Sequence, residues 1–273
     1  MTTAPDPKPV RLQRRADRAP RRFLGGGVAT AGATLLTGCD ALSRNETAVG
    51  VLRSAETLTR AVQKAVVPRT AMAQEFPASL APAVFRANGT LRPPDADYQA
   101  LAAAGFAGYG LEVHGLVAVP HRYTLAELRA LPSRTQVTRH DCVEGWSCIG
   151  QWTGVPLAAI LEAARPASSA RYVVFRCFDS MDGVGVGASD TRYYESIDLD
   201  EARHPQTILA YDLNGAPVPV ANGAPLRLRV ERQLGYKHAK YLRAIELVDS
   251  FASIRGGKGG YWEDEGYEWW AGI

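Results

Sequence analysis

The chain has 273 residues, of which 46% are hydrophobic and 22% are charged. This is the composition of a globular protein long enough for one large domain or two modest ones. It excludes a disordered chain, a collagen-like chain and a disulfide-stapled mini-protein. The net charge of +3 is concentrated at the N-terminus, because residues 1–38 hold seven basic and two acidic residues and leave 24 basic and 26 acidic residues for the rest. Since that remainder is slightly acidic, the charge gives no support for nucleic-acid binding.

An export signal is predicted over residues 1–38. The pair Arg21-Arg22 is followed by a segment, Phe23 to Gly38, that has no charged residue and is rich in Gly, Ala and Thr. That segment is too short and too weakly apolar for a spanning helix, which needs about 20 apolar residues. Paired arginines before such a segment resemble a twin-arginine signal, which carries folded proteins across a membrane. The alternative is an ordinary N-terminal helix.

The end of this segment predicts the site of membrane attachment. Leu36-Thr37-Gly38-Cys39 resembles a bacterial lipobox, in which Cys39 is acylated and becomes the mature N-terminus. Cleavage without lipidation is the alternative. We therefore expect a periplasmic or cell-envelope protein, exported folded and anchored through Cys39, with residues 39–50 as a polar tether and residues 51–273 as one domain.

The first elements of that domain are predicted from periodicity and helix-end signals. Apolar residues recur at helical spacing over residues 51–67, where Pro68 ends the helix, and the Pro/Ala-rich residues 76–98 are expected to be extended. Residues 111–117 alternate like a strand, and Thr124 to Glu127 form a capping box that opens a short helix ending at Pro132.

The later elements complete a mixed pattern. A strand is expected over residues 134–140, a helix from Pro156 with Leu157, Ile160 and Leu161 on one face, and a buried strand over residues 172–175. Asn214-Gly215 predicts a hairpin turn. Residues 226–231 alternate apolar and charged, so one face is apolar and the other highly charged. Strands mixed with short helices favour an α+β fold rather than a doubly wound sheet.

Cys142 is the first candidate functional residue. The cysteines Cys142, Cys148 and Cys177 have neither CxxC nor His spacing, which argues against a zinc site. Cys142 directly follows Arg139-His140-Asp141 at a strand end, and cationic neighbours lower the pKa of a thiol. A thiolate there would bind a soft metal or attack an electrophile. The alternative is a small buried hydrophobe.

A basic cluster near the other end of the domain is the second candidate. Six basic residues fall within 14 positions around Gly235-Tyr236: Arg227, Arg229, Arg232, Lys237, His238 and Lys240. Cations beside a glycine that admits close backbone approach suit an anion such as a phosphate. The alternative is a solvated charged face.

Several motifs in order resemble one family. They are Cys142-Val-Glu-Gly-Trp-Ser147, Trp152-Thr-Gly-Val-Pro-Leu157, Asp200-Glu-Ala202, His204-Pro205, Asn222-Gly-Ala-Pro225, and Gly235-Tyr-Lys237 followed by Lys240. From about Leu111 to Val248 the sequence resembles the sulfite oxidase-type molybdopterin-dependent oxidoreductases, in particular the exported bacterial branch of periplasmic methionine sulfoxide reductases. The resemblance implies that fold, with mixed β-sheets and short helices, and a molybdenum-molybdopterin cofactor.

The resemblance also implies a cofactor site. Cys142 would be the thiolate ligand of molybdenum, and the residues expected to contact the cofactor are Gln74, Glu75, Cys177, Asn222, Arg227, His238, Ala239 and Lys240. Of these, His238, Ala239 and Lys240 match the segment that holds the pterin phosphate. Cys177 stands where the branch usually has Thr, and Ala71 stands where it has Asn.

Two residues close to Cys142 are candidates for catalysis. Glu144 and His140 could tune protonation beside the metal, or they could orient the cysteine loop. The aromatic and acidic C-terminal segment, residues 261–270, either lines the entrance to the site or packs as an arm on the domain, and we favour the arm.

The implied activity is two-electron oxygen-atom transfer, most simply reduction of a sulfoxide or N-oxide, free or carried on a protein. We favour reduction because the Cys142 motif lacks the arginine-bearing continuation of sulfite oxidases. The alternatives are oxidation of sulfite and a non-catalytic lipoprotein that binds a ligand with the same fold. Electrons would come from a membrane cytochrome or a periplasmic carrier, which anchoring at Cys39 would keep close.

Overall fold

The computed structural model describes residues 45–181 and 191–273, so the expected signal, Cys39 and residues 39–44 of the tether lie outside it. The chain divides into two units, residues 1–59 and 60–273. Helix α2 covers Glu46–Val66 and ends before Pro68, as the periodicity predicts, and it includes residues 46–50 of the expected tether. None of the helices in the described ranges is long and apolar enough to span a membrane.

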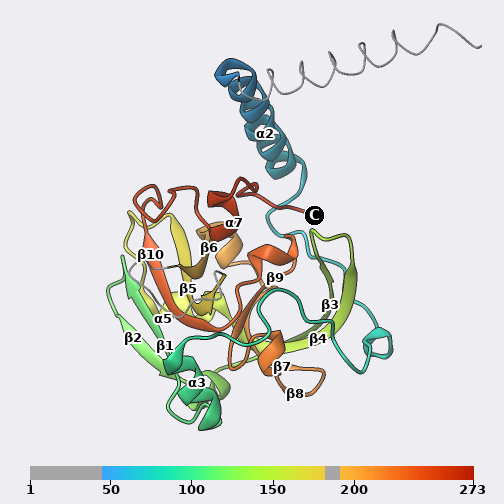
Figure 1. Ribbon diagram of the computed structural model, residues 1–273, viewed down its shortest axis with the longest axis vertical. Helices are drawn as coiled ribbons and strands as arrows, with labels where there is room; N and C mark the ends of the chain where they lie inside the picture. The colour runs from blue at the N-terminus through green and yellow to red at the C-terminus, as the bar shows by residue number, and fades with distance from the viewer. Residues whose placement is uncertain (1–44, 182–190) are drawn as a thin grey trace, which may run out of the picture. The chain divides into compact units, whose positions relative to one another are not determined.

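A mixed sheet and an antiparallel sheet form the second unit (Figure 1). The first has the order β2-β1-β10-β5-β6, in which β1 and β10 are parallel and the other pairs antiparallel. Its strands are β1 Gly110–Gly115, β2 His121–Thr124, β5 Tyr172–Ser180, β6 Arg192–Asp198 and β10 Leu242–Val248.

The second sheet has the order β3-β4-β7-β8, and β9 also pairs with β7. Its strands are β3 Arg134–Asp141, β4 Ser147–Pro156, β7 Thr207–Leu213, β8 Ala216–Pro217 and β9 Arg227–Val230. In Figure 1, β3 and β4 lie on one side of the unit and β1, β2 and β10 on the other.

The helices of the second unit are short and connect the strands. They are η1 Ala78–Leu80, α3 Ala96–Ala103, α4 Leu125–Ala130, α5 Leu157–Ala164, α6 Leu199–Ala202, η2 Val220–Asn222, η3 Gly235–Lys237 and α7 Tyr261–Asp264. One mixed and one antiparallel sheet with short helices confirm the predicted α+β fold.

Local signals placed these elements correctly. The capping box at Thr124 forms as expected, with Thr124 Oγ1 accepting from the Glu127 N–H and the Glu127 carboxylate accepting from the Thr124 N–H. At the β7–β8 turn, Asn214 and Gly215 both have positive φ, 52° and 79°, the conformation that makes Asn-Gly the preferred hairpin pair. Helix α5 buries Leu157, Ile160 and Leu161 on one face, as predicted.

Strand β9 differs from the solvated charged face considered for it. Its alternating charged residues are buried as fully as its apolar ones: Arg227 is 1% exposed, Arg229 0% and the following Glu231 3%. Both guanidinium groups lie over the indole ring of Trp152, at 4.9 and 4.7 Å from its centroid. Because a second layer covers this face, the charges sit inside the protein and must be satisfied there.

Candidate functional site

Cys142 lies in the tight turn that joins β3 to β4. The strands pair as far as Asp141 opposite Ser147. Inside the turn the Cys142 N–H donates to the Trp146 carbonyl at 2.9 Å, and the Gly145 N–H donates to the Cys142 carbonyl at 3.0 Å. Gly145 has φ +84°, which explains a glycine there. These backbone hydrogen bonds hold the position of Cys142 without using its side chain.

The pKa of the Cys142 thiol is raised, not lowered as its sequence neighbours predict. Burial raises it, and the backbone N–H of Glu144, which lowers it, does not compensate. The charge of Arg139 is taken by Asp141, whose carboxylate lies 2.9 Å from its Nε. Burial and then the charge of Arg229 lower the pKa of His140 well below its usual value, so this imidazole is neutral. A metal bound at Cys142 would therefore displace the thiol proton.

A pocket opens beside Cys142, and five parts of the chain line it. They are Asn88–Thr90, Cys142–Glu144, the end of β5 with Asp179 and Met181, Tyr193 together with the Gly235–Lys240 segment, and the C-terminal residues Trp262 and Tyr267. The structure thus brings together four of the residues expected from the sequence: Cys142, Glu144, His238 and Lys240. Because Trp262 and Tyr267 line the pocket, the C-terminal segment forms part of the pocket wall as well as packing on the domain as an arm.

Two buried cations are close to this pocket: Lys240 lines it, and Arg227 is hydrogen-bonded to the lining residue His238. The Arg227 Nη1 and Nη2 donate to the carbonyls of Asn222 (2.8 Å) and His238 (3.3 Å), while its Nε is buried without a partner. Lys240 Nζ donates to the carbonyls of Asn88, Thr90 and Ala221 at 2.6, 2.6 and 3.1 Å. Neither cation forms an ion pair with a carboxylate of the described residues.

Burial disfavours the charged form of both cations. Burial and the charge of Arg229 lower the pKa of Arg227 to about 9. Burial and the charge of Arg227 lower the pKa of Lys240 to about 7. An anionic ligand in the pocket would favour the charged forms, which is the fit expected for a phosphate.

Two buried acceptors face the same pocket. The His238 Nε2 lies 3.0 Å from the Gln233 carbonyl, and since a carbonyl only accepts, Nε2 carries the proton and Nδ1 has a free lone pair. His238 Nδ1 and Asp179 Oδ1 are both buried without a partner. A heterocycle with N–H and amino donors would satisfy them. A pterin with a terminal phosphate presents both kinds of group, so these residues fit the implied cofactor.

Metal binding here depends on that cofactor. No group of three or more His, Cys, Asp or Glu residues that could hold a metal ion occurs in the described part of the chain. Cys142 offers one soft ligand, and the remaining ligands would come from the pterin dithiolene. The residues present therefore suit a metal carried in by its own chelator.

Other expected residues lie outside the pocket lining. Glu75 forms a β-bridge with Thr138 and an ion pair with Arg134, and its neighbour Gln74 faces a separate hollow, so the structure does not bring either to Cys142. Cys177 is fully buried in the core. Asp179 is two residues further on the same strand, and it takes the pocket position that the resemblance implies for Cys177.

Asn222 and Ala239 act through their backbones. Asn222 is 6% exposed and offers its carbonyl to Arg227, and the Ala239 carbonyl accepts from the Leu228 N–H at 2.8 Å. Asn88, Gly89 and Thr90 were missed by the sequence reasoning, which treated this Pro/Ala-rich region as a crossing segment. The signal that could have found them is the polar triplet inside that region.

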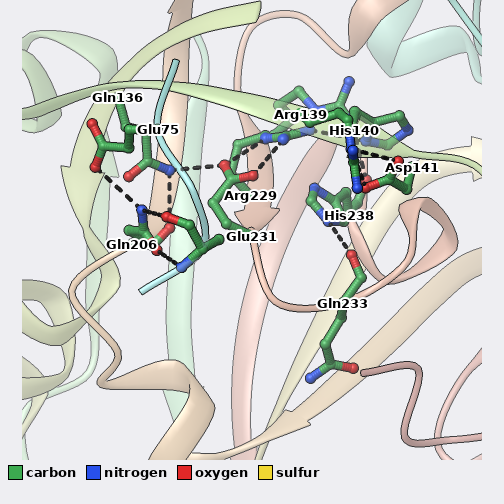
Figure 2. A network of polar contacts seen from close by, with 12 residues as sticks. Glu75, Gln136, Arg139, His140, Asp141, Gln206, Arg229, Glu231, Gln233 and His238 are labelled. Carbon is green, nitrogen blue, oxygen red and sulfur yellow. Dashed lines mark hydrogen bonds and ion pairs between the residues drawn. The ribbon is translucent and has the colours of Figure 1, made fainter. Parts of the chain in front are cut away.

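His140 lies behind the pocket, in the buried polar network that Figure 2 shows. Arg229 Nη1 donates to His140 Nδ1 at 3.0 Å, because a guanidinium cannot accept, so the His140 proton is on Nε2. A Cβ on Gly235 would lie 2.6 Å from that Nε2. His140 therefore packs against η3 and is not among the residues that line the pocket, and its two predicted roles stay predictions.

Comparison with known proteins agrees with this site. The family described as the oxidoreductase molybdopterin-binding domain matches residues 99–253, and the chain belongs to it. It is a molybdenum-molybdopterin oxidoreductase of the sulfite oxidase type.

Individual relatives are similar over different lengths. A putative protein-methionine-sulfoxide reductase subunit, YedZ1, of Azospira oryzae is 38% identical over 93% of this chain and 88% of its own. The protein-methionine-sulfoxide reductase catalytic subunit MsrP of Xanthomonas axonopodis pv. citri is 40% identical over 51% of this chain and 44% of its own. Among solved structures, the sulfane dehydrogenase SoxCD of Paracoccus pantotrophus has a TM-score of 0.47 at 21% identity, covering 55% of this chain and 40% of its own.

Replacing Lys240 with glutamate is expected to lower cofactor occupancy at least about tenfold. The substitution puts a carboxylate beside the buried anion site, and it removes the ammonium group that donates to three carbonyls. Molybdenum analysis and pterin fluorescence of the purified protein measure it. The matched control is Lys258→Glu, at an exposed lysine. Full occupancy in the Lys240→Glu protein would contradict the phosphate assignment.

Proposed function

We propose that this protein reduces a sulfoxide, free or carried on a protein, by two-electron oxygen-atom transfer. The observation that carries the proposal is the 38% identity to the YedZ1 reductase subunit over 93% of this chain. The balanced reaction takes the sulfoxide, two electrons and two protons to the thioether and water. When bound, the cofactor supplies a metal that changes its oxidation state by two, which no side chain can do.

The residues of this chain would hold the cofactor and shape the substrate space. Cys142 would bind the metal, while Arg227, His238 and Asp179 would bind the chelator. Trp262 and Tyr267, stacked at 5.2 Å between ring centroids, give the pocket an aromatic wall that suits the apolar groups on sulfur. Glu144 lies in the pocket lining and accepts a hydrogen bond from Trp146 Nε1 at 2.9 Å, which positions its carboxyl group in the pocket.

We also propose where the reaction takes place. The arginine pair and the lipobox-like Cys39 support export to the periplasm or cell envelope with a lipid anchor. The two electrons would come from a membrane cytochrome or a periplasmic carrier.

A second candidate, oxidation of sulfite, is favoured by one observation. The guanidinium of Arg86 lies 4.5 Å from the centroid of the Trp146 ring, and its charge acts on Cys142. A cation close to the metal ligand suits a dianionic substrate such as sulfite.

A substrate screen separates the two functions. With a reduced viologen dye, we expect turnover of methionine sulfoxide, free and in a peptide, because a neutral sulfoxide needs no cation at the metal. With an oxidised dye and sulfite, we expect at least about tenfold lower kcat/KM. Efficient sulfite oxidation that Arg86→Ala reduces, with no sulfoxide turnover, would overturn the proposal.

A further inference from the structure

Three charged side chains meet in a fully buried cluster behind the pocket. Lys237 of η3, Glu195 of β6 and Glu263 of α7 all have side chains with 0% exposure. Lys237 Nζ is hydrogen-bonded to Glu195 Oε1 and, at 2.6 Å, to Glu263 Oε1. A Cβ on Gly260 would lie 2.0 Å from Glu263 Oε2 and 2.8 Å from Glu195 Oε1, so the Gly260 backbone packs closely on both carboxyl groups. One ammonium therefore joins two carboxyls in the interior.

The charges of this cluster do not balance if both carboxyls are ionised. One cation and two anions would leave a net negative charge in the interior, a costly arrangement. Glu195 Oε2 and Glu263 Oε2 are both buried without a partner, although each could share a proton. If the two carboxyl groups share one proton, the net charge of the cluster is zero. That proton also gives one of the two unpartnered carboxyl oxygens a hydrogen-bond donor.

The described residues around Glu195 supply no cation other than Lys237. Of the charges that act on Glu195, Lys237 is the cation and Glu263 the anion. The other titratable groups that interact with Glu195 or Glu263 are the hydroxyls of Tyr193, Tyr194 and Tyr236 and the thiol of Cys177. Burial raises the pKa of each hydroxyl and of the thiol, so all four are neutral and leave the excess negative charge uncompensated.

The directions of the pKa shifts agree with this charge count. Burial and the Glu263 carboxylate raise the pKa of Glu195 well above its usual value. Burial alone would lower the pKa of Lys237, but the two carboxylates raise it above its usual value. At neutral pH the lysine is charged and the carboxyl pair retains a proton.

Each member of the cluster is close in sequence to a residue of the pocket wall. Lys237 stands between Tyr236 and His238, Glu263 follows Trp262, and Glu195 is on the same face of β6 as Tyr193. The cluster therefore connects the C-terminal wall of the pocket to the segment that carries His238.

We propose that Glu195 and Glu263 share one proton over Lys237, and that this proton locks the C-terminal wall of the pocket to the cofactor-binding segment. The three are positioning residues, and the proposal does not depend on which substrate the enzyme uses. Losing the proton leaves a repulsive negative charge, which pushes Glu263 and with it α7 and Trp262 outward. Because burial and the Glu263 carboxylate raise the pKa of Glu195, the lock holds at low and neutral pH and is lost as the pH rises through that pKa.

Infrared spectroscopy of the wild-type holoprotein tests the shared proton. We expect a carbonyl band of a protonated carboxyl that shifts in deuterium oxide. Glu195→Gln and Glu263→Gln should each abolish it, because the one remaining carboxylate then pairs with Lys237 and keeps no proton. A wild type without the band, or a band that survives in either variant, would overturn the proposal.

Hydrogen exchange tests the lock. Exchange of residues 259–267 is compared at each pH between wild type and the two glutamine variants, so that the intrinsic pH dependence of exchange cancels. At alkaline pH we expect at least about tenfold faster exchange in the wild type than in the variants, together with faster release of fluorescent pterin. Equal exchange and equal pterin release at every pH would refute the lock.

Glu231→Gln is the matched control for the charge count. Glu231 pairs one-to-one with Arg229, both with 0% exposed side chains, so its removal leaves a buried guanidinium unpaired. We expect this variant to lower the yield of folded protein at every pH, whereas Glu263→Gln keeps the wild-type yield. Loss of folded Glu263→Gln protein to the same extent as Glu231→Gln would mean that both glutamates are ionised, against the proposal.

Discussion

Cys142→Ser protein is expected to lose more than about 100-fold in turnover and most of its molybdenum, while its fold remains that of the wild type. Loss of a residue that only supports a ligand already costs about 10–100-fold, so loss of the ligand itself should cost more. A serine hydroxyl is a hard ligand that a soft metal site does not favour. The turn itself survives, because backbone hydrogen bonds to Trp146 and Gly145 hold it.

Metal analysis, turnover with a reduced dye and circular dichroism check this result together. Cys148→Ser is the matched control, since Cys148 is half-buried on β4 and does not line the pocket. We expect it to keep wild-type molybdenum and turnover. Wild-type turnover in the Cys142→Ser protein would remove Cys142 from the metal site.

The parts of the fold that were predictable from the sequence are those set by short-range chemistry. The capping box at Thr124, the Asn214-Gly215 turn and the strand that ends at Asp141 each depend on residues a few positions apart. The turn that holds Cys142 is equally local. Such signals fix an element whatever its surroundings, so they persist in the folded protein.

The rest of the site comes from contacts between distant segments. Lys240 binds the carbonyls of Asn88 and Thr90, about 150 positions away in the chain, and nothing in either segment alone indicates that pairing. Asp179 joins them from the end of β5. Residues that meet only through tertiary packing carry no local periodicity, so the sequence could not place them.

Charges near Cys142 in sequence were a poor guide to its electrostatics. Arg139 forms an ion pair with Asp141, and burial makes His140 neutral. Neither residue therefore supplies the positive charge expected for a reactive thiolate. Desolvation of the Cys142 thiol is then the largest effect, and it raises the pKa of that thiol. Sequence adjacency gives the charges available but not their partners or their solvent exposure.

Arg229, on the buried face of β9, carries the second large expected effect. Arg229→Met is expected to lower the free energy of unfolding by about 3–5 kcal/mol, which is the usual cost of removing one partner of a buried ion pair. Arg229 Nε and Nη2 donate to the Glu231 carboxylate at 2.9 and 2.6 Å, and neither side chain is exposed. Without Arg229, Glu231 keeps the amide of Gln136, at 2.8 Å, but no cation among its described partners. His140 Nδ1 also loses its donor.

Urea unfolding is measured for Arg229→Met and for the double variant Arg229→Met/Glu231→Leu. The comparison distinguishes the contribution of the Arg229–Glu231 ion pair to stability from that of packing on Trp152. The double variant removes both charges and should recover most of the loss, because apolar groups often replace a buried ion pair at little cost. If the double variant is as unstable as the single one, the effect comes from lost packing on Trp152, which both variants share, and not from the unpaired carboxylate. Recovery would instead assign the cost to the buried, unpaired charge of Glu231 and mark Arg229 as the group that compensates it.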